Sequence, residues 1–131
     1  ETDVDRTFRN TNMLIWHKEL WLIDHGASLY FHYSWVNWQK HAVSPFVQIK
    51  DHVLLPEASG LEEANADMRR LLTEEKIREI VALIPDDWLL WSESPGTPQE
   101  IREIYIRFLC ERLAHSETFI KEAQDARKAL I

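Results

Sequence analysis

The chain has 131 residues, of which 45% are apolar and 28% are charged, and its formal net charge is −7. This length suits a single domain over residues 1–131, and the apolar and aromatic content excludes a disordered chain. One cysteine excludes an internal disulfide framework and fits a reducing cytoplasm, while the acidic balance argues against nucleic acid as a partner. No apolar run approaches the roughly 20 residues that a membrane span needs, so we expect a cytoplasmic protein.

Residues 12–24 predict a β-hairpin. Two short apolar segments flank the turn His17-Lys18-Glu19, and each segment is apolar on both of its faces. This pattern is typical of a hairpin that other elements cover on both sides. We therefore expect Trp16 and Trp21 to pack in the core rather than to form a surface for stacking sugars or bases.

A helical body is predicted for residues 59–131, after a stretch at 27–38 that fits either a short helix or an irregular aromatic segment. Three of the expected helices follow an N-cap pattern, namely Ser59 with Glu62, Thr73, and Thr97 with Pro98 and Glu100, and a last helix is expected to start at Ser116 and run to the end. Apolar residues recur behind these caps at helical spacing. The fold class that we expect is mainly α with a small β-hairpin near the N-terminus.

Polar segments stand on both sides of the hairpin, where packing gives no reason for them. Before it runs Asp3-Val4-Asp5-Arg6-Thr7-Phe8-Arg9-Asn10-Thr11-Asn12, and after it follows Ile23-Asp24-His25-Gly26. Phosphoryl transfer needs a carboxylate near the acceptor hydroxyl, together with oxygen ligands that hold Mg²⁺ against the phosphates. Because a hairpin returns the chain to its starting point, an asparagine before it and Asp24 after it can bind the same metal ion.

These segments resemble a known family. The stretch Asp5-Arg6-Thr7 with Asn10-Thr11-Asn12-Met13-Leu14-Ile15-Trp16, followed by Leu20-Trp21-Leu22-Ile23-Asp24-His25-Gly26, looks like the catalytic and metal-binding loops of HipA-like kinases. Type II phosphatidylinositol 4-kinases share this layout. The stretch Asp51-His52-Val53-Leu54-Leu55-Pro56 and the helix start at Thr97-Pro98 also look similar to HipA-like proteins, so the resemblance covers most of the chain.

The resemblance implies a role for each matching residue. Asp5 would be the catalytic base, and Asn10 and Asp24 would bind Mg²⁺, with Asn12 as the alternative to Asn10. Arg6, His25 and Gly26 would support the site, although His25 stands where most protein kinases have phenylalanine. The implied cofactors are Mg²⁺ and ATP, and the implied acceptor is a hydroxyl group on a protein or a small molecule.

A kinase also needs a glycine-rich loop over the phosphates and a strand-borne lysine. The chain has three widely spaced glycines and no such loop. We therefore expect the C-terminal lobe of a HipA-like kinase without its N-terminal lobe, which would be a partner. In this lobe, residues 1–26 are the catalytic loop, hairpin and Asp-x-Gly segment, and residues 59–131 are the helical body. The isolated chain would then be inactive.

Two other functions compete with this interpretation. One is a non-catalytic helical module that binds a protein partner. The other is a metal-dependent hydrolase that uses Asp3, Asp5 and Asp24, which leaves the asparagines and the hairpin without a role. A histidine-based metal site is disfavoured, because no two successive histidines among the first five have the i, i+4 spacing of a metal-binding pair on a helix. We interpret Cys110 as a packing residue rather than a nucleophile.

Overall fold

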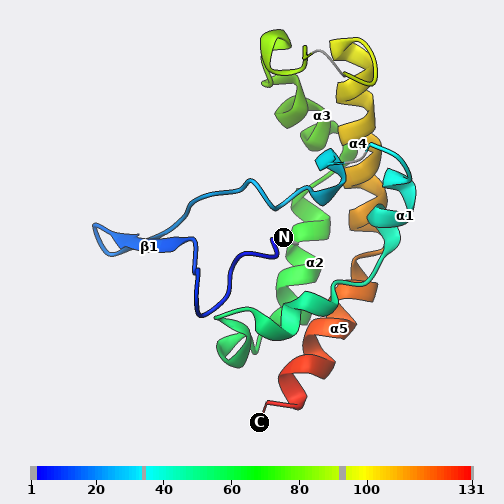
Figure 1. The fold of residues 1–131 in the computed structure, drawn as a ribbon. Coiled ribbons are helices and arrows are strands. Elements are labelled where there is room, and N and C mark those ends of the chain that lie inside the picture. Colours follow the sequence, from blue (N-terminus) through cyan, green and yellow to red (C-terminus); the bar gives the residue numbers. More distant parts are fainter. Residues whose placement is uncertain (1–2, 34, 92–93, 131) are drawn as a thin grey trace.

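The computed structural model in Figure 1 describes residues 3–33, 35–91 and 94–130. Its strands are β1 (Met13–Trp16) and β2 (Glu19–Leu22), and its helices are α1 (Trp38–Val43), α2 (Leu61–Leu71), α3 (Glu74–Ala82), α4 (Pro98–Ala114) and α5 (Ser116–Lys128). Short 3-10 helices connect them at Tyr30–Tyr33, Val47–Asp51, Leu55–Glu57 and Asp86–Trp88. The predicted fold class, mainly α with a small β-hairpin, is confirmed. Residues 1, 2, 34, 92, 93 and 131 of the predicted domain lie outside the described residues.

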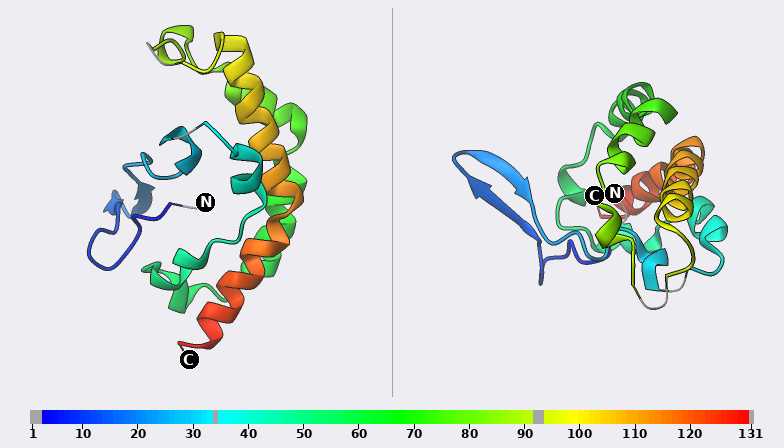
Figure 2. Two further views of the ribbon diagram at one scale, coloured as in Figure 1. Left: turned by 45° about the vertical axis from the view of Figure 1, so that its right-hand side comes forward. Right: turned by 90° about the horizontal axis from the view of Figure 1, so that it is seen from above.

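The helical body is built around the two C-terminal helices. Helices α4 and α5 follow each other in one long arc, with α3 and α1 against α4 and with α2 against α5. In Figure 2 (left), the N-terminal segment lies on the inner side of this arc. The body therefore forms a curved wall of helices, and the hairpin extends from the opposite side of the molecule.

The core lies where α1, α3 and α4 meet. Its buried members are Phe31, Ala42, Ile77, Val81, Leu89, Ile101, Tyr105, Ile106 and Phe108. Phe31 sits in an aromatic group, with its ring centroid 4.5 Å from that of Phe108 and 5.3 Å from that of Trp35. Phe31, in the 3-10 helix Tyr30–Tyr33, thus anchors the N-terminal third of the chain to α4. Full burial of one such side chain stabilises the fold by about 1.5–3 kcal/mol.

Two of the predicted helix caps are confirmed. The hydroxyl of Thr73 accepts from the backbone N–H of Lys76 at 3.2 Å. At Thr97 the capping box is complete: its hydroxyl accepts from the N–H of Glu100 at 3.3 Å, and its own N–H donates to the Glu100 carboxylate at 2.8 Å. These bonds to the charged form hold the pKa of Glu100 below its usual value. A Cβ atom on Gly96 would lie 2.7 Å from the Glu100 carboxylate, so glycine leaves room for the box.

The predicted capping box of Ser59 with Glu62 is wrong. Helix α2 begins at Leu61 behind Gly60, and no side chain caps it. The N–H of Ser59 donates instead to the carbonyl of Glu57 at 2.9 Å, which keeps Ser59 in the turn that follows the preceding 3-10 helix. The sequence pattern was present, but the chain enters the helix one residue later than the pattern requires.

The hairpin is confirmed with a shorter turn. Its antiparallel register pairs Met13 with Leu22 and Trp16 with Glu19, so that Glu19 belongs to β2 and not to the turn. The two turn residues His17 and Lys18 have φ values of 49° and 67°. Positive φ at both central positions is the geometry of a type I′ turn, which matches the twist of the strands without the usual Asn-Gly pair.

The prediction that the hairpin is covered on both faces is wrong. It projects from the body (Figure 2), and Ile15, Trp16 and Trp21 remain 70%, 60% and 50% exposed. Within the described residues, β1 and β2 pack on each other and no second layer covers them. Trp16 and Trp21 are therefore not core residues, whereas Trp35 and Trp38 do pack against the core.

Candidate functional site

Arg6 joins the loops at the open end of the hairpin. Its side chain is almost completely buried, at 2% exposure. One terminal nitrogen donates to the carbonyl of Asn12 at 2.5 Å, and the other lies 3.3 Å from Nδ1 of His25 and 3.4 Å from the carboxylate of Asp3. A planar guanidinium with several such contacts fixes the relative positions of its partners. Arg6 therefore holds the segment before the hairpin to the segment after it.

The buried carboxylate of Asp3 completes this polar centre. One oxygen accepts from the backbone N–H of Asp5 at 3.0 Å, and the other accepts from the Ser28 hydroxyl at 3.1 Å. A buried charge is tolerated only when it is paired and hydrogen-bonded, and both conditions are met here. Asp3 thus positions the backbone of the candidate base Asp5. The sequence signal that could have identified Asp3 as a partner of Arg6 is its position three residues before that arginine.

Asn12 and Asp24 lie at the two ends of the hairpin. The N–H of Ile23 donates to the carbonyl of Asn12 at 2.9 Å, which extends the ladder by one pair and places Asp24 directly beyond it. Both Asn12 and Asp24 have left-handed backbones, with φ of 46° and 51°. Asparagine and aspartate tolerate this conformation better than most residues, and it is frequent at functional sites.

The side chain of Asn12 is buried without full hydrogen bonding. The residue is 8% exposed, and its amide nitrogen has no hydrogen-bond partner. An unpaired buried polar group of this kind costs about 1–3 kcal/mol. Native structures contain few such groups, so the unpaired amide makes Asn12 a candidate functional residue.

Asn10 has a different environment. It is exposed, its N–H donates to the Thr7 hydroxyl at 3.4 Å, and its carbonyl accepts from the Thr7 N–H at 2.9 Å. The same Thr7 N–H also lies 2.9 Å from the carbonyl of Asp5, which closes the loop on itself. The structure therefore brings Arg6, Asn12 and His25 into contact and leaves Asn10 on the outer turn.

The loop is braced by the segment at residues 51–56. The carbonyl of Arg6 accepts from the N–H of Val53 at 2.9 Å, and Thr7 forms a β-bridge with His52. Leu55, which follows, is 2% exposed and anchors this segment in the interior. The stretch that resembles HipA-like proteins downstream of the hairpin thus contacts the candidate catalytic loop directly.

Gly26 does not adopt a left-handed backbone. A Cβ atom at this position would lie 3.5 Å from a carboxylate oxygen of Asp24, which is an ordinary contact. Glycine is therefore not required by backbone strain here. Its effect is to leave one side of the Asp24 carboxylate uncovered.

The residues fit the Mg²⁺ that the resemblance implies. Mg²⁺ binds oxygen ligands and commonly takes only one or two from the protein, the others coming from phosphates and water. Asn12 and Asp24 carry an amide oxygen and a carboxylate of the kind that such a donor set would use, and the unpaired amide nitrogen of Asn12 would be able to donate to a phosphate oxygen. In the described part of the chain, no three histidine, cysteine, aspartate or glutamate side chains gather as a metal site, but the expected pair is smaller than that.

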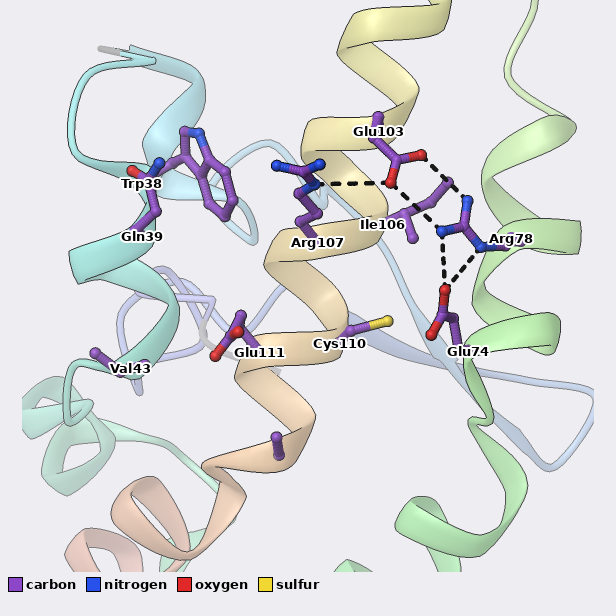
Figure 3. Close-up of a pocket in the computed structure, with 11 residues that line it drawn as sticks. Trp38, Gln39, Val43, Glu74, Arg78, Glu103, Ile106, Arg107, Cys110 and Glu111 are labelled. Atoms are coloured by element: carbon purple, nitrogen blue, oxygen red, sulfur yellow. Dashed lines mark hydrogen bonds and ion pairs between the residues drawn. The ribbon is translucent and has the colours of Figure 1, made fainter.

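A separate cavity of about 740 Å³ lies between α1, α3 and α4 (Figure 3). Two of its carboxylates pair with one arginine: Arg78 lies 2.8 Å from Glu74 and 3.1 Å from Glu103, and the hydrogen bond from Arg78 lowers the pKa of Glu103. Burial raises the pKa of the Cys110 thiol in its wall, which keeps the thiol protonated and supports the interpretation of Cys110 as a packing residue. None of the predicted site residues lines this cavity.

The chain matches no protein-family model, no curated protein and no solved structure. Among the helices of the described residues, none combines the length and the apolar character that crossing a membrane requires. A functional assignment therefore depends on the chemistry of the hairpin and of the loops that flank it.

Proposed function

We propose that this chain is the C-terminal lobe of a HipA-like kinase, which in the intact protein transfers the γ-phosphoryl group of ATP to a hydroxyl acceptor. The observation that carries the proposal is the buried Arg6, which contacts both Asn12 and His25. Because Arg6 joins these segments, the loop that carries the candidate base Asp5 lies at the same end of the hairpin as the candidate metal ligands. Phosphoryl transfer depends mainly on such positioning and on charge stabilisation.

Each residue then has one task. The Asp5 carboxylate orients the acceptor hydroxyl and takes its proton, and Asp3 fixes the Asp5 backbone through a 3.0 Å hydrogen bond. Oxygen atoms of Asp24 and Asn12 would hold Mg²⁺, which would supply positive charge to neutralise the phosphates. His25, beside Arg6, keeps the turn after Asp24 in place.

Asn12 is our preferred ligand over Asn10. Spacing from Asp5 favours Asn10, but burial, the unpaired amide nitrogen and the pairing with Ile23 favour Asn12. The outward position of Asn10 gives it a turn-forming role with Thr7. Replacing each asparagine with alanine separates the two roles.

The glycine-rich loop and lysine of a kinase are not supplied by this sequence, so another lobe would have to provide them. We therefore expect negligible binding of MgATP to the isolated chain. Calorimetry at millimolar ligand measures this. Clear saturable binding would mean that the chain contains a complete nucleotide site and is not half of one.

The test of the proposed function is transfer of γ-labelled phosphate to the acceptor, or autophosphorylation, by the intact protein. Asp5→Asn should lower the rate by about 10²–10⁴-fold, because the amide keeps the shape and removes the base. Asp24→Asn and Asn12→Ala should lower it in a way that added Mg²⁺ partly restores, whereas Asn10→Ala is the matched control. Parental turnover in Asp5→Asn would reject Asp5 as the base.

A non-catalytic interaction module remains the second candidate, because the hairpin exposes Ile15, Trp16 and Trp21. Exposed apolar patches mark surfaces for protein partners. A partner that binds equally with and without MgATP, and that Trp16→Ser releases while Asp5→Asn does not, would favour this function over the kinase.

A further inference from the structure

A groove of about 490 Å³ runs between α2 and the other long helices, and Ser28 and Leu29, which follow the hairpin in the chain, also line it. Its walls are mostly aliphatic and aromatic side chains from α2, α3, α4 and α5, including Leu61, Met68, Leu72, Ile77, Leu109 and Phe119. A groove of this size and character falls in the range of binding sites for small ligands.

Helix α2 forms the outer wall of the groove without being buried itself. None of its residues is buried, and Met68 is 48% exposed, as is Ile80 of the facing helix α3 at 49%. The sequence places a continuous apolar stripe on α2, and a stripe of this kind is normally covered. Here it faces a space between helices rather than a filled core.

Two polar groups stand in this apolar wall. Ser116 is 1% exposed, and its hydroxyl has no hydrogen-bond partner. Arg112, near the C-terminus of α4, lines the same groove as Ser116. A buried hydroxyl without a partner costs free energy, which a ligand with an acceptor group would recover.

Arg112 has bonds to carbonyl groups but no anionic partner. One terminal nitrogen donates to the carbonyls of His41, Ala42 and Ser44 at 3.3, 3.2 and 2.5 Å, and the guanidinium lies 4.5 Å from the centre of the Phe119 ring. Among the described residues, no carboxylate forms an ion pair with it. Burial disfavours its charged form and lowers the pKa of Arg112. An incoming anion would compensate this desolvated charge.

We propose that this groove binds a long-chain carboxylate, with its apolar chain along α2 and its carboxylate between Arg112 and Ser116. The chemistry of the walls selects this class: the apolar sides accept an alkyl chain, while a cation and a hydroxyl donor accept a carboxylate. The positive charge of Arg112 would repel an alkyl ammonium ion. The site shares none of its proposed contacts with Asp5, Asn12 or Asp24, so it goes beyond the proposed kinase function.

The experiment is a calorimetric titration of the 131-residue chain with dodecanoate below its micelle concentration, with dodecyltrimethylammonium as the probe of opposite charge. We expect saturable one-to-one binding of dodecanoate. The ammonium ion should bind at least about tenfold more weakly, because it lacks the carboxylate that accepts hydrogen bonds, and a hydrogen bond to a charged group commonly contributes about this factor. Ser116→Ala should weaken dodecanoate binding several-fold.

A matched pair of variants tests the location. Ala64 and Ala66 are both exposed on α2, but Ala64 lines the groove and Ala66 does not. Ala64→Trp should fill the groove and abolish dodecanoate binding, whereas Ala66→Trp should bind like the parent, with helicity by circular dichroism confirming that both fold.

Three results would overturn the proposal. They are the absence of saturable dodecanoate binding, equal binding of the ammonium ion, and full binding by Ala64→Trp. If the chain does not bind dodecanoate but forms a concentration-dependent dimer that Ala64→Trp dissociates, the groove is instead the binding site for a second copy of the chain.

Discussion

The N-terminal segment at residues 3–28 and the helical body are held together by different forces. In the body, Ile101 and Phe31 are 0% and 1% exposed and pack in an apolar and aromatic core. In the N-terminal segment, the most buried residues are Arg6 and Asp3, at 2% and 3%, while the hairpin leaves its tryptophans exposed. One region is stabilised by apolar burial and the other by hydrogen bonds around a buried ion pair.

This difference indicates which region fixes the positions of its side chains most closely. Apolar packing tolerates changes that keep volume and pattern, whereas a guanidinium with several fixed partners sets positions to within a hydrogen bond. The candidate site lies in the polar region, where positions matter most. It also follows that the two regions should lose their structure separately, because regions with few buried apolar contacts open at lower free energy than a core.

The largest expected effect comes from Arg6→Met, which breaks the polar region. Removal of one partner leaves the buried Asp3 carboxylate unpaired, a change that costs about 3–5 kcal/mol. Amide hydrogen exchange should show lost protection at residues 13–22 and retained protection in α4. Arg9→Met, an exposed arginine in the same loop, is the matched control and should change neither.

A second variant separates charge from packing in this region. Because an apolar pair of similar volume removes the unpaired buried charge, Asp3→Leu combined with Arg6→Met should recover the part of the protection that depends on this charge. The part that depends on the hydrogen bonds to Asn12 and Ser28 should stay lost. Unchanged exchange of the hairpin in Arg6→Met alone would show that the ion pair does not hold the region.

Ile101→Ala tests the apolar region. The side chain is 0% exposed at the centre of the core, so its truncation should cost about 2–5 kcal/mol. Urea denaturation should show this as a loss of global stability, in contrast to the local loss expected for Arg6→Met. Leu83→Ala, at a residue 80% exposed at the end of α3, should stay within about 0.5 kcal/mol of the parent.

A smaller effect is expected for Thr97→Ala, which removes the cap of α4. Loss of such a cap typically costs about 0.5–2 kcal/mol. Thr118→Ala removes the same hydroxyl from an exposed position inside α5 and serves as the control. Equal unfolding free energies for these two variants would mean that the capping box adds nothing to stability.

The helical body was predictable where the signal is local. The caps at Thr73 and Thr97 and the apolar stripe of α4 lie within a few residues of one another, and the structure confirms them. The hairpin was also predictable, but not its exposure, since apolar strands give the same pattern whether or not a second layer covers them. Ser59 does not cap α2, because its backbone N–H donates to the carbonyl of Glu57 and holds the residue in the preceding turn.

The candidate site was predictable only as a set of residue types. The contact of Arg6 with His25 spans 19 positions, and no local pattern encodes it. The sequence suggests Asp3 only as a residue of a hydrolase site, because its role as a buried anchor appears once Ser28 folds back on it. The choice between Asn10 and Asn12 also requires the three-dimensional structure, since these two asparagines have the same side chain and differ only in burial.

The smallest expected effect is a pH dependence at the boundary of the two regions, where His32 stacks on Trp35 at 5.5 Å between ring centroids and meets the edge of Tyr105 at 5.3 Å. Burial lowers the pKa of His32 below its ordinary value of 6.5. The unfolded chain therefore binds a proton before the folded chain does as the pH falls through 6.5, so stability should decrease on acidification and be fully present above this value.

Urea midpoints between pH 7.5 and 5.5 measure this effect in a window above the titration of the carboxylates (about pH 4). We expect a shallow decline, because the ring is partly exposed and solvent screens its charge. His32→Gln should flatten the decline, since glutamine does not titrate. His17→Gln, in the exposed turn of the hairpin, should leave it unchanged. An equal slope in His32→Gln and the parent would show that another group couples protonation to folding, and that the aromatic contact between the two regions is insensitive to charge.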